Sequence, residues 1–494
     1  MAQNDPVSPG PTHPAVPGGA LGRRAFLQHA GMGAGIVGLA RLLQEQGVLR
    51  PSSRAAGSGV AKGVGAAGQN PTTTHFPAKA QSVIWLFMYG GPSGIDLFDP
   101  KPELNRRHGE ALGETVDAFF GKPGPLMRTP FAFAQHGQSG AWVCDRFPAL
   151  AGCVDDIAFL RSCRSGSNNH APALLQMNTG LPRMGFPSAG SWVTYGLGSE
   201  NRDLPGFVVM YDPRGVPVGG QALWGSGFLP GAHQGTHFRP TGSPLLDLDT
   251  PTDVSIEGRR AQLDLLARLN QEYADHHPGE EVLAARLESF ELAYRMQSEA
   301  PKLVDLSGES AATQKLYGMD NFLSRPFGTQ LLMARRMVEQ GVRFVQVYSG
   351  GPGGEWDAHA NLRRNHHERC AETDQPIAGL LTDLKQRGLL ANTLVVWGGE
   401  FGRLPVSQGT LGRDHNPHGF VTWMAGGGVR GGVSHGATDP LGYRAVQDPV
   451  SVPDLHATIL HLLGLDHRHL RFLHQGRPYR LTDTAGEVVR SILA

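Results

Sequence analysis

The sequence has few cysteines, no net charge and no long apolar run. Each of these three absences excludes a class of protein. Four of the 494 residues are cysteine and none stands in a CxxC spacing, so neither a zinc ribbon nor a thioredoxin-type redox pair is supported. Basic and acidic residues number 44 each, so no overall field favours nucleic acid as a partner. No run reaches the roughly 20 apolar residues that a bilayer requires, so we expect no transmembrane span in the mature chain.

Glycine and proline, by contrast, are abundant, with 67 and 36 residues. Apolar residues make up 40% of the chain and charged residues 18%, as in a globular enzyme. The glycines and prolines are therefore expected in shaped loops between regular elements, where active sites are often found.

The N-terminal segment has the pattern of a targeting signal. Residues 22–28 read GRRAFLQ, and a weakly apolar Gly/Ala-rich stretch follows at 31–40. This pattern resembles a twin-arginine export signal; the alternative is an arm with a chance arginine pair. We predict a signal region at 1–50, a flexible linker at 51–78, and a folded domain at 79–494 that acts in the periplasm or cell envelope.

Apolar strand patterns alternate with helical periodicity through the rest of the chain. The strand patterns lie at 82–89, 157–160, 207–211, 342–348, 393–397 and 420–424, and the helical ones at 258–275, 280–297, 327–339, 372–387 and 453–463. This alternation predicts an α/β fold, with a doubly wound, mostly parallel sheet flanked by helices and a helical insertion at about 256–300.

Polar residues gather beside the strand ends, where an open α/β sheet binds its ligands. Asp96 lies in GGPSGIDLFDPKP (90–102), while Asp357 and His359 lie in SGGPGGEWDAHANL (349–362). Glu400 and Arg403 lie in GGEFGRLP (398–405). We predict metal ligands at Asp96, Asp357, His359 and Glu400; the alternatives are a turn-capping Asp, an ordinary His, and a Glu400–Arg403 ion pair. Arg403 could equally hold an anionic group of the substrate.

The densest cluster is GRDHNPHGF at 412–420, which places Asp414, His415 and His418 within five positions. All three residue types can bind a divalent ion, and no apolar periodicity explains two imidazoles here. We predict that all three are metal ligands, with chance surface histidines as the alternative. The histidines at 366, 367, 276 and 277 lie on polar helical stretches and are expected to be solvated.

Several of these motifs occur in the order typical of a known family. GGPSGIDLFDPKP, WDAH, GEFGR, and GRDHNPH with the following MAGGGVRGGVSHGATD resemble the exported domain-of-unknown-function family 1501 of planctomycete-type bacteria. That family is similar to the alkaline phosphatase and sulfatase superfamily, whose members hold two divalent metals at strand ends and cleave phosphate or sulfate esters. The resemblance therefore implies an alkaline-phosphatase-like fold.

The resemblance also assigns roles to residues, with two departures. Asp96 matches the ligand after the first strand, and Asp357 with His359 resembles an Asp and His pair that is usually spaced more widely. Glu400 replaces the Asp of an Asp-His dipeptide, and Phe401 replaces its His. Either His415 or His418 supplies the missing imidazole, or one of the two metal positions is altered or absent.

The second departure concerns the nucleophile. In RSGSNNHAPALLQMNTG (164–180) the family comparison places His170 near the nucleophile position, with Ser165 and Ser167 slightly upstream. We predict catalytic roles for Ser167, His170 and Arg403, and substrate binding by Asn169 and Arg403. Two alternatives stay open for Asn169 and His170: they bind substrate or metal at the helix N-terminus without forming a covalent intermediate, or they only cap the start of the helix.

Two functions follow from this set of residues. The first is a metal-dependent hydrolase of small-molecule or glycan phosphate or sulfate esters, which uses one or two divalent ions, zinc or manganese. The second is a binding protein of the cell envelope that holds a metal on a degenerate phosphatase or sulfatase fold and takes a glycan or protein partner.

Overall fold

The computed structural model describes residues 74–240, 242–245, 255–276 and 281–494. The predicted signal region and nearly all of the predicted linker lie outside the described residues. Among the helices of the described part, none is long and apolar enough to cross a membrane.

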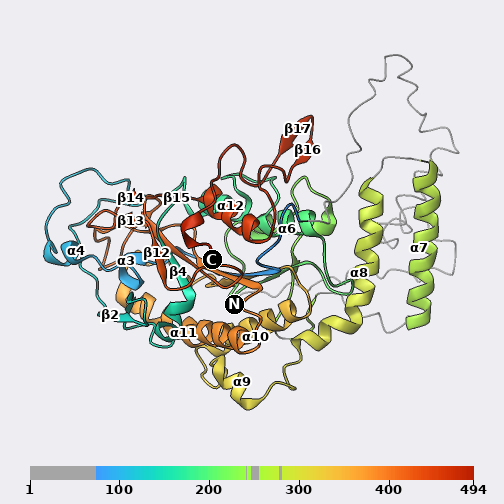
Figure 1. The fold of residues 1–494 in the computed structure, drawn as a ribbon, viewed down its shortest axis with the longest axis horizontal. Coiled ribbons are helices and arrows are strands. Elements are labelled where there is room, and N and C mark those ends of the chain that lie inside the picture. Colours follow the sequence, from blue (N-terminus) through green and yellow to red (C-terminus); the bar gives the residue numbers. More distant parts are fainter. Residues whose placement is uncertain (1–73, 241, 246–254, 277–280) are drawn as a thin grey trace, which may run out of the picture. The chain divides into compact units, whose positions relative to one another are not determined.

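A nine-stranded sheet forms the centre of the fold (Figure 1). Eight strands run parallel, and only β11 runs in the opposite direction. The order is β12 (Val433–His435), β4 (Ile157–Arg164), β11 (Phe420–Ala425), β8 (Thr393–Gly398), β1 (Ser82–Met88), β7 (Phe344–Ser349), β5 (Phe207–Met210) and β6 (Thr236–His237), with β15 (Val450–Ser451) also paired to β4. All six predicted strands are present; the three that the sequence missed have only two or three residues each, too few for a pattern.

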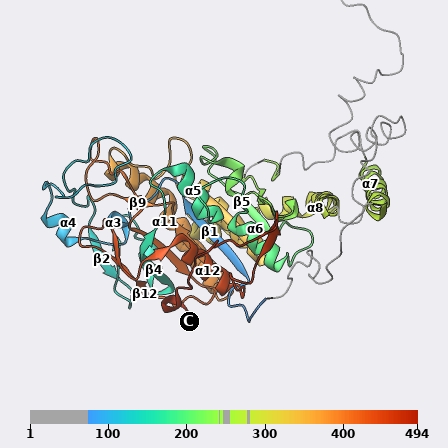
Figure 2. The ribbon, with the colours of Figure 1, turned by 90° about the horizontal axis from the view of Figure 1, so that it is seen from above.

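Helices cover both faces of this sheet, as the continuous apolar strands require. Successive residues of β1 point to opposite faces: Leu86 and Met88 pack in a core with α10 (Arg325–Glu339) and α11 (Leu362–Gln386). Trp85 and Phe87 pack in a second core with α5 (His170–Thr179), α6 (Ala189–Leu197) and α12 (Val452–Leu462). Figure 2 looks down on this second side. The predicted doubly wound α/β fold class is confirmed.

The predicted helices are all present, although α11 begins at Leu362 and not at 372. Its first turns carry the polar sequence LRRNHHERC, yet Arg369 and His366 are buried. The expectation that His366 is solvated is wrong: its Nε2 accepts a hydrogen bond from the Ser93 amide, and burial lowers its pKa to about 3. Helices α7 (Ile256–His276) and α8 (Glu281–Val304) occupy the segment of the predicted insertion.

Short elements complete the described fold. They are α3 (Gly94–Leu97), α4 (Pro102–Arg106), α9 (Ala311–Leu316), the 3-10 helices η1 (Leu150–Asp156), η2 (Gly220–Leu223), η3 (Gly231–His233) and η4 (Arg490–Ile492), and the pairs β2 (Phe133–His136) with β3 (Ala141–Cys144), β9 (Gly402–Arg403) with β10 (His415–Asn416), β13 (Ala437–Thr438) with β14 (Ala445–Gln447), and β16 (Phe472–His474) with β17 (Arg477–Tyr479). The four cysteines are buried free thiols.

One buried histidine of α12 makes the stability of this fold dependent on pH. His456 is fully buried against Trp85, its Nε2 bonds the Met177 carbonyl, and burial lowers its pKa to about 4. In the unfolded chain the imidazole of His456 has its usual pKa of about 6.5 and takes up a proton more readily than in the folded chain. The folded state is therefore favoured fully above pH 6.5, and this contribution of His456 to stability is lost as the pH falls towards 4. Between pH 7 and pH 5 the wild type is expected to lose about 2 kcal/mol more unfolding free energy than a His456→Gln variant, measured in urea.

The exposed His469 provides a matched control for this measurement. A His469→Gln variant is expected to follow the wild type at both pH values. An equal pH dependence of the wild type and His456→Gln would show that His456 does not carry the effect.

Candidate metal centre

The direction of the strands brings five segments of the chain to one edge of the sheet. The carboxyl ends of β1, β7 and β8 share that edge because these strands are parallel. Strand β11 is reversed, so the segment that precedes it, β10, lies at the same edge. Strand β10 pairs with β9, with His415 opposite Arg403, and α5 begins at His170 shortly after the parallel strand β4.

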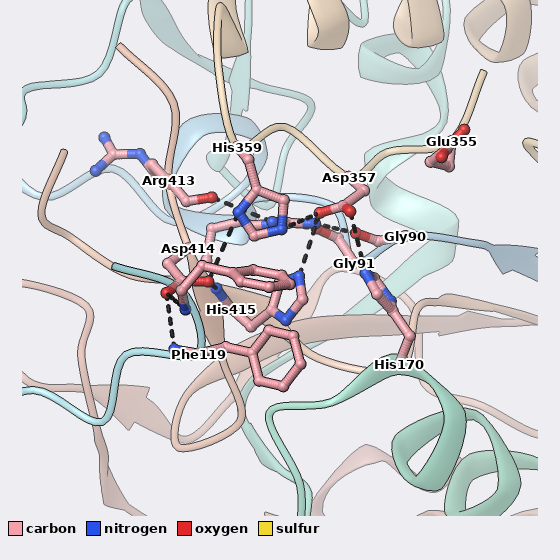
Figure 3. Close-up of polar contacts among 12 residues, drawn as sticks. Gly90, Gly91, Phe119, His170, Glu355, Asp357, His359, Arg413, Asp414 and His415 are labelled. Carbon is pink, nitrogen blue, oxygen red and sulfur yellow. Dashed lines mark hydrogen bonds and ion pairs between the residues drawn. The ribbon is translucent and has the colours of Figure 1, made fainter. Parts of the chain in front are cut away.

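Three imidazoles converge on the carboxylate of Asp357 at this edge (Figure 3). The Nε2 atoms of His359 and His415 lie 3.0 and 3.2 Å from Asp357 Oδ1. The Nε2 of His170 lies 3.2 Å from Asp357 Oδ2. Three histidines from three segments of the chain therefore present the same ring atom to one carboxylate.

Each of these rings is held by an oxygen at its other nitrogen. The Nδ1 of His170 lies 2.7 Å from Glu400 Oε1, and the Nδ1 of His415 lies 2.6 Å from the Asn168 carbonyl. The Nδ1 of His359 lies 2.5 Å from Gln408 Oε1. Such contacts fix the tautomer and orientation of metal-binding histidines.

The tautomers follow from the hydrogen bonds around His359 and His415. The Asn168 carbonyl can only accept, so His415 Nδ1 carries the proton; burial lowers the pKa of this imidazole to about 4, so its Nε2 presents a lone pair. The Gln408 amide nitrogen donates to the Phe120 carbonyl, which turns its oxygen to His359 Nδ1. The Nε2 of His359 is buried and has no hydrogen-bond partner in the described part of the chain. At His415 a ring lone pair thus faces a carboxylate oxygen, and at His359 a buried ring nitrogen faces the same oxygen without a hydrogen bond, an arrangement that fits a bound cation.

The carboxylate of Asp357 at the centre is held in its ionised form. Burial by itself raises the pKa of Asp357, but Arg403 and the surrounding imidazoles outweigh it and hold this pKa far below its usual range. Burial lowers the pKa of His170, yet the carboxylates of Asp357 and Glu400 raise it to about 9. The centre therefore attracts positive charge.

Two overlapping groups of side chains have atoms close enough to hold an ion. One consists of His170, Asp357 and His415, and the other of His359, Asp414 and His415. Since His415 belongs to both, the residues present fit either one ion or two adjoining ions.

A loop after α4 packs on the faces of these rings. Asp414 Oδ2 accepts hydrogen bonds from the amides of Phe119 and Phe120, at 2.8 and 2.9 Å. The Phe119 ring stacks on His415, with centroids 5.2 Å apart, and Phe120 meets His359 edge-on at the same distance. The loop thus shields one side of the centre and is tied to a candidate ligand.

The sequence matches the family described as "Protein of unknown function (DUF1501)" over residues 80–493. The chain belongs to the DUF1501 family. No curated protein matches it.

Several solved structures are similar to this DUF1501 chain at low sequence identity. The lipoteichoic acid synthase LtaP from Listeria monocytogenes is 10% identical, with a TM-score of 0.34 over 83% of this chain and 78% of LtaP. The PsFucS1 sulfatase from Pseudoalteromonas sp. is 13% identical, with a TM-score of 0.33 over 78% of this chain and 68% of the sulfatase. The alkaline phosphatase of the Antarctic bacterium TAB5 is 13% identical, with a TM-score of 0.33 over 78% of this chain and 98% of the phosphatase.

The structure brings together most of the ligands predicted for this DUF1501 chain. Asp357, His359, Asp414 and His415 meet, and His170, predicted at the nucleophile position, joins them. Glu400 lies directly behind His170, where it also accepts a hydrogen bond from the Gly90 amide at 3.0 Å. Glu400 was predicted as a metal ligand, whereas in the structure it holds the ring of His170.

Two predicted ligands lie outside the cluster. Asp96 is fully buried, and its oxygens accept hydrogen bonds from the guanidinium of Arg413, at 2.8 and 3.2 Å, and from the Ser93 hydroxyl. The assignment of Asp96 as a metal ligand is therefore corrected to one half of a buried ion pair. His418 points to Asp117, 3.4 Å away, and packs against Tyr443, so the structure does not support it as a ligand.

The predicted catalytic and substrate-binding groups around these ligands have other partners. Arg403 is buried and donates to Asp357 and to the carbonyls of Gly90 and Gly91, so in this structure it positions the Asp357 carboxylate. Asn169 is the N-cap of α5, its side-chain oxygen bonded to the amide of residue 171, as in the capped-helix alternative. The Ser167 hydroxyl accepts a hydrogen bond from the Asn169 amide.

Two residues that position the side chains of these loops were not among those predicted from the sequence. Gln408 joins His359 to the loop of Phe119 and Phe120, and Arg413 neutralises Asp96. Arg413 stands inside the GRDHNPH motif, beside Asp414, and this position was the one sequence feature that pointed to a role for Arg413. Gln408 and the two phenylalanines carry no such signal.

Proposed function

We propose that this protein is a metal-dependent hydrolase of phosphate or sulfate esters. One observation carries the proposal: three histidines present Nε2 to Asp357 while an oxygen holds the Nδ1 of each. With Asp414 the two groups offer five candidate ligands, one more than the four of a closed structural site, and imidazole and carboxylate ligands suit zinc or manganese.

Each protein group around the site has a part in this chemistry. A bound divalent ion would polarise the ester oxygen and make water a better nucleophile. Arg403 keeps Asp357 ionised, and Glu400 holds His170 in the orientation seen in Figure 3. The N-terminus of α5 offers backbone amides and the positive end of a helix dipole to an anionic ester.

We further propose that water, and not a serine, attacks the ester. His170 takes the first position of α5 and is held by Asp357 and Glu400. The Ser167 hydroxyl accepts a hydrogen bond from the Asn169 amide at 3.1 Å, so it is committed to the turn before the helix. Phe119 and Phe120 cover the rings on one side and limit access of bulk water.

The test measures metal content and ester hydrolysis on the same preparation. The chain, purified without chelator, is expected to carry near-stoichiometric zinc or manganese by elemental mass spectrometry. It is expected to hydrolyse p-nitrophenyl phosphate or p-nitrophenyl sulfate, to lose activity with EDTA, and to regain it with metal. His415→Ala is expected to lose both metal and activity.

His418→Ala is the matched control, because it removes a histidine of the same segment that lies outside the cluster. It is expected to retain metal and activity. Metal absent from the wild type even after reconstitution would refute the metal centre. Bound metal without hydrolysis of any ester in a broad panel would favour a non-catalytic binding protein.

A further inference from the structure

A cavity of about 1070 Å³ lies beside the edge strand β6 of the sheet, and no residue of the metal centre lines it. Its walls come from α6 and the segment that follows it, from the segment after β5, from η2, η3 and β6, and from α8. A volume of this size is at the upper end of the range for small-molecule pockets. Neither the proposed hydrolysis nor the fold explains what this cavity holds.

One wall of the cavity is a stack of flat rings. His237 lies on Tyr211 with ring centroids 4.0 Å apart and an interplanar angle of 6°. Tyr211 in turn stacks on Trp224, at 6.0 Å and 25°. Trp224 is 5% exposed, whereas His237 is only partly buried, so the stack starts in the core and ends at the cavity.

The same wall carries hydrogen-bonding groups that the protein does not use. Within the described residues, the Tyr211 hydroxyl, the Gln234 amide, the Thr236 hydroxyl and the ring nitrogens of His237 have no hydrogen bond or ion pair, and none of these atoms is sealed from solvent. Burial lowers the pKa of His237 to about 4, so its ring is neutral at pH 7. Hydroxyl, amide and neutral imidazole can each donate and accept, as ligand hydroxyl groups require.

Charged side chains of the cavity wall are mostly neutralised by neighbours. Glu291 pairs with Arg260 at 2.6 Å, and Arg295 pairs with Asp203 at 3.2 Å. Arg202, which is exposed, is the one charged wall residue without an ion pair in the described part of the chain. The wall therefore selects for an uncharged ligand more than for an anion or a cation.

We propose that this cavity binds a neutral oligosaccharide, with a sugar ring stacked on His237 and its hydroxyls bonded to Tyr211, Gln234 and Thr236. A sugar ring has an apolar face of C–H groups that packs on a flat ring, and a rim of hydroxyls that both donate and accept. A nucleoside base would also stack, but it offers few hydroxyls to so many such groups. This inference does not depend on the proposed hydrolase activity.

The test titrates the full chain with neutral hexasaccharides by isothermal calorimetry. The panel is maltohexaose, cellohexaose, xylohexaose, mannohexaose and chitohexaose. At least one is expected to bind, and His237→Ala is expected to weaken that binding by about tenfold, because the stacked contact is lost. Gln234→Ala, which leaves the ring stack intact, provides a second variant and is expected to weaken binding severalfold.

Two control variants show whether the sugar binds in this cavity or elsewhere on the protein. His474 stacks on Phe228 at 4.9 Å outside the cavity, so His474→Ala is expected to bind as the wild type does. Asp357→Asn at the metal centre is also expected to leave binding unchanged. Failure of every hexasaccharide, or equal binding by wild type and both cavity variants, overturns the proposal. Tighter binding of adenosine, lost in His237→Ala, would overturn it in favour of a nucleoside site.

Discussion

An Arg413→Met variant is expected to unfold with a free energy about 3–5 kcal/mol below that of the wild type. Arg413 and Asp96 are both fully buried, and the guanidinium donates to both carboxylate oxygens. Removing the arginine leaves a negative charge in the core, with Ser93 as its one remaining hydrogen-bond donor among the described residues. Equilibrium unfolding in urea measures this loss.

A second substitution tests whether the orphaned charge is the cause. In an Asp96→Asn/Arg413→Met double variant no charge remains, and much of the lost stability is expected to return. Arg106→Met is the matched control, because Arg106 pairs with Glu103 at an exposed position, where solvent screens the pair, and its loss is expected to leave the unfolding free energy nearly unchanged. Equal losses for Arg413→Met and Arg106→Met would refute a stabilising role for the buried pair.

An Asp357→Asn variant is expected to bind zinc at least about a hundredfold more weakly than the wild type. All three Nε2 atoms of the centre face this carboxylate, so it supplies the charge that holds a cation there. Asparagine keeps an oxygen for Arg403, which also bonds the Gly90 and Gly91 carbonyls, so the fold is expected to survive. Competition with a chromophoric chelator gives the affinity.

Asp212 provides the control, since it also follows a strand of the sheet and pairs with an arginine, Arg214. An Asp212→Asn variant is expected to keep the wild-type zinc affinity. If Asp357→Asn kept it as well, the cluster around Asp357 would not be the metal site.

The strands and the loops beside them could be predicted because their signals are local. The sequence of β1 is apolar at nearly every position, which fits a strand covered on both faces, and its residues are all buried. The strands β8 and β11 are likewise buried along their whole length. Helix α11 differs, because the polar sequence of its first turns predicts solvent exposure. In the structure His366 accepts a hydrogen bond from the Ser93 amide, and Arg369 donates to the Gly354 carbonyl, so both are buried.

By itself, the sequence determined which loops carry the chemistry, because acidic residues and histidines beside glycine-rich strand ends are typical of ligand sites. It did not determine which of these residues meet. Asp96 and Arg413 are 317 positions apart, and only the folded chain shows that their charges cancel and remove Asp96 from the metal centre. His170 and Glu400 are 230 positions apart, and their hydrogen bond turns a residue near the expected nucleophile into a candidate ligand. Residue type and spacing are local, whereas ring orientation, tautomer and ion pairing depend on contacts that only the tertiary structure makes.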